Sequence, residues 1–213
     1  MRKGFTIAEL LVAISVIAVI GAVVAEVFSR SLRGGNKAQI IGVVKQNGQA
    51  TLEAMDKTLR NSDEIVCPVI TIAELTAAGV NPVIKNSDTA TVVKDGKYTR
   101  FRYKAPVSGV NGYILQDNPV YVAPLSQESF LNDVCSNAWN DPNSPAAVYI
   151  TDTNTKNGVS VTSATANIFI RNKQAGFRDI LTINFDLKPG AQVPAAISGQ
   201  IDPVTFTTTI QLR

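Results

Sequence analysis

The hydrophobic pattern of the chain begins with one long apolar run. Residues 5–28 are almost uninterrupted by polar side chains. As a helix, these roughly 24 residues would be about 36 Å long, which is enough to cross the hydrocarbon core of a bilayer. The run is too long for the core of an ordinary secretory signal, and the basic residues Arg2 and Lys3 come directly before it. The pattern therefore predicts a transmembrane helix at residues 5–28.

The pattern then becomes amphipathic over residues 29–64. Apolar side chains recur at three- and four-residue spacings up to Arg60, at Ile41, Val44, Leu52, Met55 and Leu59. This predicts that the same helix continues and packs one face on a core. The pair Gly34 and Gly35 weakens the helix most, so we expect local unwinding there.

From Ile65 onward the pattern is that of β-structure. Alternating or β-branched runs predict strands at residues 90–94, 98–104, 112–116, 120–123, 147–151, 159–162, 167–171, 180–187 and 204–212. Asp95-Gly96 and Asn157-Gly158 each predict a β-hairpin turn. The residues thus predict an α+β fold, in which a long N-terminal helix packs on an antiparallel β-sheet in a head at residues 65–213.

Two short helices are also expected in the head. Thr71 and Glu74 have the spacing of a capping box before a helix at residues 75–78. A second short helix is predicted at residues 126–134, with weaker support from the sequence.

The amino-acid composition excludes several classes of function. The chain contains no histidine, which excludes Ser-His-Asp and Cys-His catalysis and histidine metal sites. The formal net charge is +3, and loss of Arg2 and Lys3 would lower it to +1, so no global charge favours nucleic acid. We expect no enzyme activity, no cofactor and no bound metal.

The two cysteines, Cys67 and Cys135, are enough for one disulfide in an oxidising compartment. Such a bond would close a loop of about 68 residues and contribute about 4 kcal/mol in the chain-entropy model. Two unpaired buried thiols are the alternative.

Glu9 is the unusual residue of the apolar run. A carboxylate at mid-bilayer depth costs about 2 to 3 kcal/mol, so an acid in a membrane helix indicates a function. A plain signal-anchor helix with an incidental acid is the alternative interpretation.

The stretch from Lys3 to Ile14, KGFTIAELLVAI, resembles the cleavage and methylation signal of type IV pilins and pseudopilins. The resemblance implies a leader at residues 1–4, cleavage between Gly4 and Phe5 by a prepilin peptidase, and N-methylation of Phe5. It also implies that Glu9 pairs with the N-terminal amine of a neighbouring subunit during assembly. For residues 29–213 it implies the α/β-roll arrangement of pilins.

The family implies a location and partners as well. We expect a single-pass protein of the cytoplasmic membrane, with its N-terminus in the cytoplasm and its head outside, that later joins an extracytoplasmic filament. Its partners would be other pilins or pseudopilins, the prepilin peptidase, an assembly platform in the membrane and the lipid bilayer. The sequence leaves open whether the machine is a pilus, a type II secretion system or a DNA-uptake system.

One strand of the head carries a candidate nucleic-acid contact. Strict alternation over residues 98–104 places Arg100, Arg102 and Lys104 on one face, where a basic stripe can hold a phosphate backbone. The solvated outer face of an ordinary strand has the same pattern. A pilus-displayed module for DNA or adhesion is therefore the alternative function, and a plain membrane-anchored enzyme is a third.

The segment from Asp152 to Gly158 has oxygen-bearing side chains at alternate positions before a glycine, as calcium loops do. Lys156 stands where a third oxygen ligand would be required. We therefore expect a polar turn there.

Overall fold

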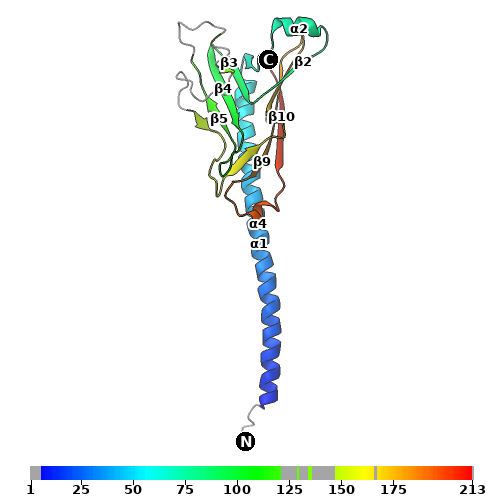
Figure 1. Ribbon diagram of the computed structural model, residues 1–213, viewed down its shortest axis with the longest axis vertical. Helices are drawn as coiled ribbons and strands as arrows, with labels where there is room; N and C mark the ends of the chain where they lie inside the picture. The colour runs from blue at the N-terminus through cyan, green and yellow to red at the C-terminus, as the bar shows by residue number, and fades with distance from the viewer. Residues whose placement is uncertain (1–5, 121–128, 130–133, 136–146, 166, 213) are drawn as a thin grey trace. The chain divides into compact units, whose positions relative to one another are not determined.

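The structure is a computed structural model that describes residues 6–120, 129, 134–135, 147–165 and 167–212 (Figure 1). Structural statements below refer to these residues. The chain divides into two units, Met1–Ile40 and Ile41–Arg213, and each is described by itself. The second unit contains the head predicted at residues 65–213 and also the last part of α1. This whole unit is called the head from here on.

Helix α1 spans Ile7–Arg60 without a break and therefore contributes to both units. No proline interrupts it, and Lys57 and Arg60 in its last turn complement the negative end of the helix dipole. Gly34 and Gly35 lie within the helix, so the local unwinding expected at these residues is not present.

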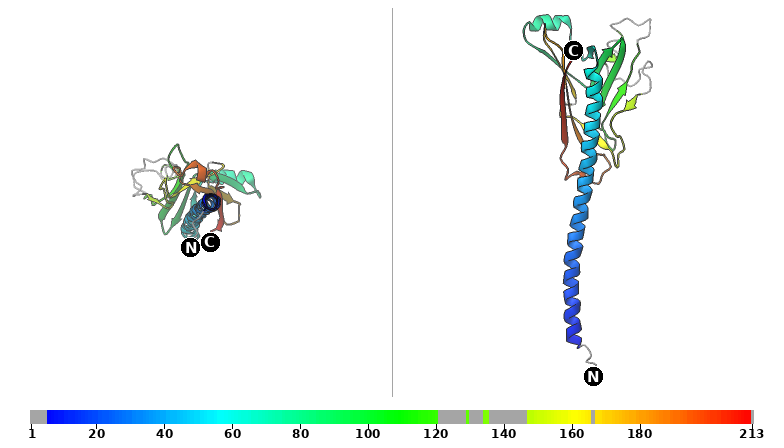
Figure 2. Two further views of the ribbon diagram at one scale, coloured as in Figure 1. Left: turned by 90° about the horizontal axis from the view of Figure 1, so that it is seen from below. Right: turned by 180° about the vertical axis from the view of Figure 1, so that it is seen from behind.

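The head contains two antiparallel sheets where the sequence predicted one. The first sheet has the strand order β1-β3-β4-β5-β6, and the second has the order β10-β9-β8-β2 with β7 paired to β9 (Figures 1 and 2). The strands of the first sheet are β1 (Glu64–Cys67), β3 (Thr89–Lys94), β4 (Lys97–Lys104), β5 (Tyr113–Asp117) and β6 (Val148–Tyr149). Those of the second are β2 (Val83–Ser87), β7 (Val159–Thr162), β8 (Phe169–Lys173), β9 (Ile180–Pro189) and β10 (Val204–Gln211).

The head part of α1 lies with sheet strands on both sides of it (Figure 2). The side chains that it buries recur every three or four residues, as the amphipathic pattern requires. They are Val44, Gly48, Thr51, Met55 and Leu59. A long helix packed on antiparallel sheets confirms the predicted α+β fold.

Two contacts fix the position of α1 in the head. The ring of Phe206 in β10 occupies the space beside Gly48, so that a Cβ at Gly48 would come within 2.1 Å of it. The same ring stacks on Phe185 of β9 with their centroids 5.6 Å apart. On the other side, the Thr51 hydroxyl donates to the carbonyl of Ile150, 3.1 Å away. Gly48 is therefore a point of close approach between α1 and the second sheet.

Helix α2 (Ile72–Ala78) begins with the predicted capping box. The Glu74 amide donates to the Thr71 hydroxyl at 3.2 Å, and the Thr71 amide donates to the Glu74 carboxylate at 2.9 Å. Lys85 of β2 also contacts this carboxylate, and together these hydrogen bonds lower the pKa of Glu74. The helix starts at Ile72, three residues earlier than expected. A third helix, α4 (Ala195–Ser198), precedes β10.

Local chemistry explains which predictions hold. The Asp95-Gly96 hairpin joins β3 to β4, and both residues have positive φ, 48° and 73°. Strand β7 matches its predicted bounds, and β3, β4, β5, β6, β8, β9 and β10 overlap theirs. Asn157-Gly158 forms a turn that precedes β7 and does not join two neighbouring strands.

Other predictions are wrong or concern residues outside the described part of the chain. Strand β2 was missed because its sequence, VIKNS, is short and half polar. Of the strand predicted at 120–123, only Val120 is described, and it is not in a strand. Of the helix predicted at 126–134, only Ser129 and Val134 are described, and both are helical.

Replacement of Gly48 by alanine tests the contact between α1 and Phe206 of the second sheet. We expect Gly48→Ala to destabilise the head by about 1 to 3 kcal/mol, because the added methyl group must displace the Phe206 ring. Gly42→Ala is the matched control on the same helix. Nothing lies within 4 Å of a Cβ there, so alanine should be neutral or stabilise by up to about 1 kcal/mol. Urea unfolding of the detergent-solubilised full chain measures both, and equal effects would refute the assigned contact.

Candidate functional site

The first turn of α1 holds Glu9 in a defined position. The Thr6 amide and the Thr6 hydroxyl each donate to Glu9 Oε2 at 2.9 Å, and the Glu9 amide donates back to the Thr6 hydroxyl at 3.3 Å. This is a capping box, in which the acid also lies at the positive end of the helix dipole. Gly4 and Phe5, the predicted cleavage residues, lie outside the described residues. The side chain of Glu9 is exposed.

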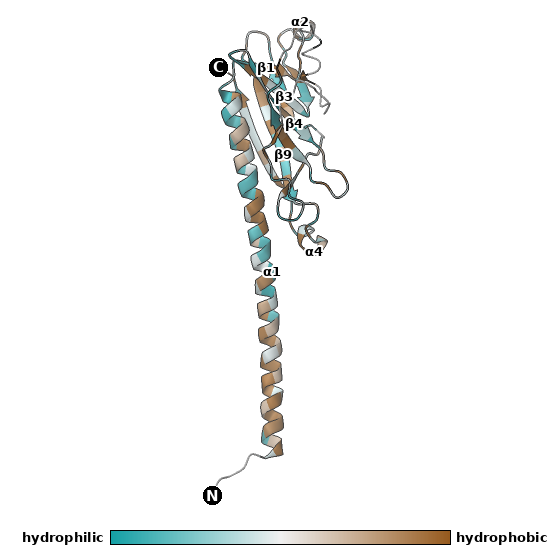
Figure 3. Ribbon diagram, turned by 90° about the vertical axis from the view of Figure 1, so that its left-hand side faces the viewer, coloured by the Kyte–Doolittle hydropathy of each residue, from teal (hydrophilic) through white to brown (hydrophobic). Residues whose placement is uncertain are grey.

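The first part of α1, up to Phe28, is coloured mostly hydrophobic in Figure 3. Leu10, Leu11, Ile17 and Phe28 are each more than half exposed, and none of the most apolar 18-residue window is buried. By length and composition this helix is able to cross a membrane. A signal sequence near an N-terminus shares this length and composition.

A pair of charged side chains lies at the end of the apolar run. Arg30 Nη2 lies 2.5 Å from Glu26 Oε1, one helical turn away, and both side chains are largely exposed. Such a pair stabilises a helix by only about 0.3 to 0.5 kcal/mol. The charges therefore mark where the apolar surface ends more than they stabilise the fold.

Cys67 and Cys135 form a disulfide, as the sequence suggested. It attaches the end of β1 to the segment that contains Val134, and Cys67 and Val134 are fully buried together. The carbonyl of Val134 accepts hydrogen bonds from the Thr91 hydroxyl at 3.4 Å and from Arg100 Nη1 at 3.3 Å. The disulfide and these two bonds together tie Val134 to the first sheet.

The predicted basic stripe is buried. Arg100 and Arg102 are 0% and 3% exposed, and both pair with Asp117 of β5, whose side chain is fully buried. Arg100 makes a two-pronged contact with that carboxylate, from Nε at 2.9 Å and from Nη2 at 2.7 Å, while Arg102 Nη2 adds a third bond at 2.7 Å. We call Arg100, Arg102 and Asp117 the ionic cluster.

The position of the ionic cluster corrects the expectation of a solvated basic face. Of the three predicted residues, only Lys104 is partly exposed. The two arginines stabilise the interior of the head and present no charge to a phosphate backbone. The DNA-contact hypothesis thereby loses two of the three exposed charges on which it was based. Asp117 was not singled out from the sequence, although an isolated acid at the end of an apolar strand next to a basic strand is a signal for such pairing.

The segment from Asp152 to Gly158 is a polar turn. Asp152 Oδ1 accepts the Asn154 amide at 2.9 Å, and Asn154 Oδ1 accepts the amides of Lys156 and Asn157 at 2.9 and 3.1 Å. These oxygens hold the backbone of the turn. Across the described part of the chain, no group of three or more acidic or cysteine side chains is arranged to hold a metal ion.

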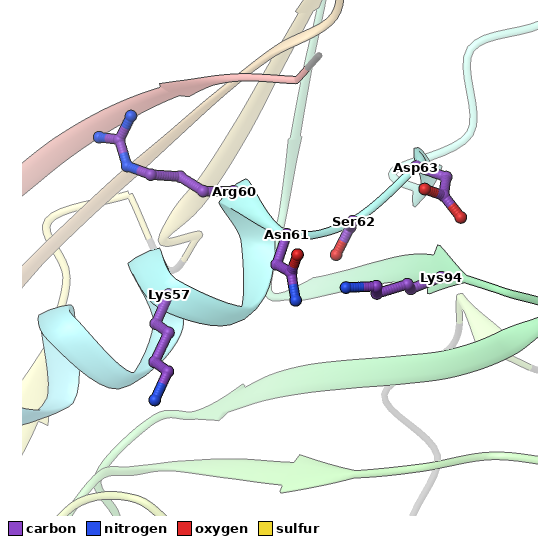
Figure 4. Close-up of a pocket in the computed structure, with 6 residues that line it drawn as sticks. All are labelled: Lys57, Arg60, Asn61, Ser62, Asp63 and Lys94. Atoms are coloured by element: carbon purple, nitrogen blue, oxygen red, sulfur yellow. The ribbon is translucent and has the colours of Figure 1, made fainter.

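An open polar groove lies where α1 ends (Figure 4). It has a volume of about 690 Å³ and is lined by Lys57, Arg60, Asn61, Ser62, Asp63 and Lys94. The Arg60 guanidinium points away from the other labelled side chains and pairs with Asp56 at 2.7 Å, while the Lys94 ammonium points toward Asn61. The lining contains no nucleophile beside a base. Its lysines are solvated, and Asp63 on the rim opposes a polyanion, so we assign the groove no chemistry.

No protein-family model matches the chain, and no curated protein or solved structure shows significant similarity to it.

Removal of the shared acid tests the structural role of the ionic cluster. We expect Asp117→Asn to destabilise the head by about 3 to 5 kcal/mol, because two buried guanidinium groups lose their counter-ion. The control is Asp56→Asn, which breaks the more exposed pair with Arg60 and should cost less than about 1 kcal/mol. Urea unfolding midpoints compare the two variants. A similar small loss in both would show that the cluster is not a structural core.

Proposed function

We propose that the chain is a minor pilin or pseudopilin, a structural subunit of a type IV pilus or of a type II secretion-like filament. The observation that carries the proposal is Glu9, a carboxylate held in the first turn of an otherwise apolar and exposed helix. The residues around it, from Lys3 to Ile14, resemble the processing signal of that family.

In this proposal the prepilin peptidase cuts after Gly4, and Phe5 becomes the methylated N-terminus. The subunit waits in the cytoplasmic membrane with residues 5–28 in the bilayer. The N-terminus faces the cytoplasm and the head lies outside. A disulfide in the head supports an oxidising compartment for that unit. Assembly then transfers the apolar surface of α1 from lipid to the α1 helices of neighbouring subunits.

In this proposal Glu9 has two successive tasks. In the single chain, its carboxylate satisfies the Thr6 amide and hydroxyl, which lowers the cost of placing an acid in an apolar environment. In a filament, the same carboxylate would meet the amine of a neighbouring subunit. At about 4 Å and an effective dielectric near 20, two such charges attract by roughly 4 kcal/mol. That attraction sets the register of neighbouring helices more than the strength of their packing.

The α+β head supports the family's α/β-roll arrangement in its main feature, a long helix packed on antiparallel strands. A display module for DNA finds less support, because the arginines that suggested it belong to the ionic cluster. The proposal assigns the chain no catalytic role, and its partners are other filament subunits, the peptidase and the assembly platform.

Substitution at Gly4 tests the processing step. We expect Gly4→Leu to leave the precursor uncut in cells that have a prepilin peptidase, because a bulky residue before the cut does not fit a narrow protease site. Mass spectrometry of the membrane fraction should show retention of residues 1–4, while the unaltered chain loses them. Normal processing of the variant would refute the assigned cleavage site.

Substitutions at Glu9 separate its cap from its charge. Glu9→Gln keeps a side chain that can cap the helix but removes the negative charge. We expect both Glu9→Gln and Glu9→Ala to be cleaved normally and to reduce the yield of sheared filaments at least tenfold. Glu26→Ala, at the other acid of the N-terminal unit, is the control and should assemble. Full assembly of the glutamine variant would show that the charge of Glu9 has no role.

A further inference from the structure

The second sheet of the head has an edge strand at each end, and each edge strand is paired on one side only. Its order is β10-β9-β8-β2, so β10 forms one edge and β2 the other. Among the described residues, no hydrogen bond joins the backbone of either strand to a group on the side away from the sheet. Free backbone N–H and C=O groups in a row are a template for another strand.

The edge at β10 lacks the usual protection. Its eight residues, VTFTTTIQ, include no charged side chain and no proline, and they pair with β9 in eight consecutive steps without a bulge. Charges, prolines, bulges and short length are the devices by which proteins block such edges.

The edges of the first sheet, in contrast, are protected. At β1, the carbonyl of Val66 accepts a hydrogen bond from Arg171, and the disulfide at Cys67 ties the strand to Cys135. The opposite edge, β6, has only two residues. Within the residues that the structure describes, both edges of the second sheet are open, over five residues at β2 and eight at β10.

Strand direction determines which edges can join. Each neighbouring pair in the second sheet is antiparallel, and the sheet path has four strands, so β10 and β2 run in opposite directions. Subunits of a polar filament are related by rotation about one axis and translation along it. Every copy of β10 therefore has the same direction along that axis, and two copies of β10 cannot pair antiparallel. The β10 edge of one copy and the β2 edge of the next can.

We propose that β10 of one subunit pairs with β2 of a neighbouring copy, so that the second sheets of successive heads join edge to edge. The inference rests on the proposed filament function and identifies a head-to-head contact that is additional to α1. It is a heterologous contact, because it uses two different surfaces of the same chain. Such contacts form an open helical filament when the rotation between copies does not close a ring.

The side chains of the two edges fit each other. On the outer face, β10 presents the neutral hydroxyls of Thr205, Thr207 and Thr209, and β2 presents Asn86 and Ile84, which is 59% exposed. The charge of Lys85 is already matched by Glu74 of its own chain. Pairing would therefore bring no like charges together and would cover an exposed isoleucine.

Length gives the contact two possible registers. Strand β2 has five residues and β10 has eight, and the outer faces stay together only when the register changes by two residues. All five residues of β2 can therefore pair in two registers, with Asn86 opposite Thr205 or opposite Thr207. At about 3.4 Å per residue the two registers differ by about 7 Å along the strand.

Cysteine cross-linking in the full chain tests the contact. Asn86→Cys is combined in turn with Thr205→Cys, Thr207→Cys and Thr209→Cys, and membranes that assemble filaments are oxidised with copper phenanthroline. We expect at least one combination to give a ladder of disulfide-linked multimers that reductant dissolves. Within one chain, Asn86 and Thr209 lie on strands three spacings apart, about 14 Å, which a disulfide cannot bridge.

The matched control replaces the β10 cysteine with Asn184→Cys. Asn184 is the cross-strand partner of Thr207, is exposed on the same face, and lies one strand inside the edge. It should give no ladder. Filaments that depend on Glu9 but show no ladder at any of the three threonines would overturn this inference and leave the proposed function standing. Dimers from Thr207→Cys alone would also overturn it, because they indicate β10 paired with itself. If the unaltered chain forms no filament, the proposed function fails as well.

Discussion

One continuous helix has to satisfy two environments, and the rest of the molecule follows from that constraint. Over residues 7–28, α1 exposes apolar side chains on all sides, an apolar surface larger than a monomeric protein ordinarily presents to water. From Ile41 onward it buries one face and exposes polar residues on the other. The backbone hydrogen bonds are internal throughout, so the change of environment requires no break in secondary structure. The head must therefore be built around a helix whose direction is already set.

The sequence was most informative where the physics is local. The amphipathic spacing up to Arg60, the Thr71 and Glu74 box and the Asp95-Gly96 turn each depend on residues a few positions apart, and all three are present. The apolar run that contains Glu9 is likewise recognised from the sequence alone. What these patterns do not contain is the arrangement of strands in space. The division of the head into two sheets depends on pairings between residues as far apart as Ser87 and Phe169.

The ionic cluster illustrates the same limit for the candidate site. Alternation along β4 correctly separates its two faces, but both faces of that strand are covered. Arg100 and Arg102 were expected at the surface because an edge or one-sided strand places its charges in solvent. Strand β4 is central in the first sheet, and the partner that allows the charges to be buried, Asp117, comes from the next strand. Periodicity alone does not reveal whether a polar face is solvated or paired.

The contact between Gly48 and Phe206 has a mechanical consequence. Asp63, just beyond α1, and Leu212, just beyond β10, line the same small cavity, so the two elements run in the same direction from their contact at Gly48. A pull along the head part of α1 would load the β9 and β10 ladder along its length through the Phe206 ring, alongside the hydrogen bond from Thr51 to Ile150. In that shear geometry the eight paired positions share the force instead of opening one after another. A subunit that transmits tension through its helix would keep its C-terminal strand in place by this arrangement.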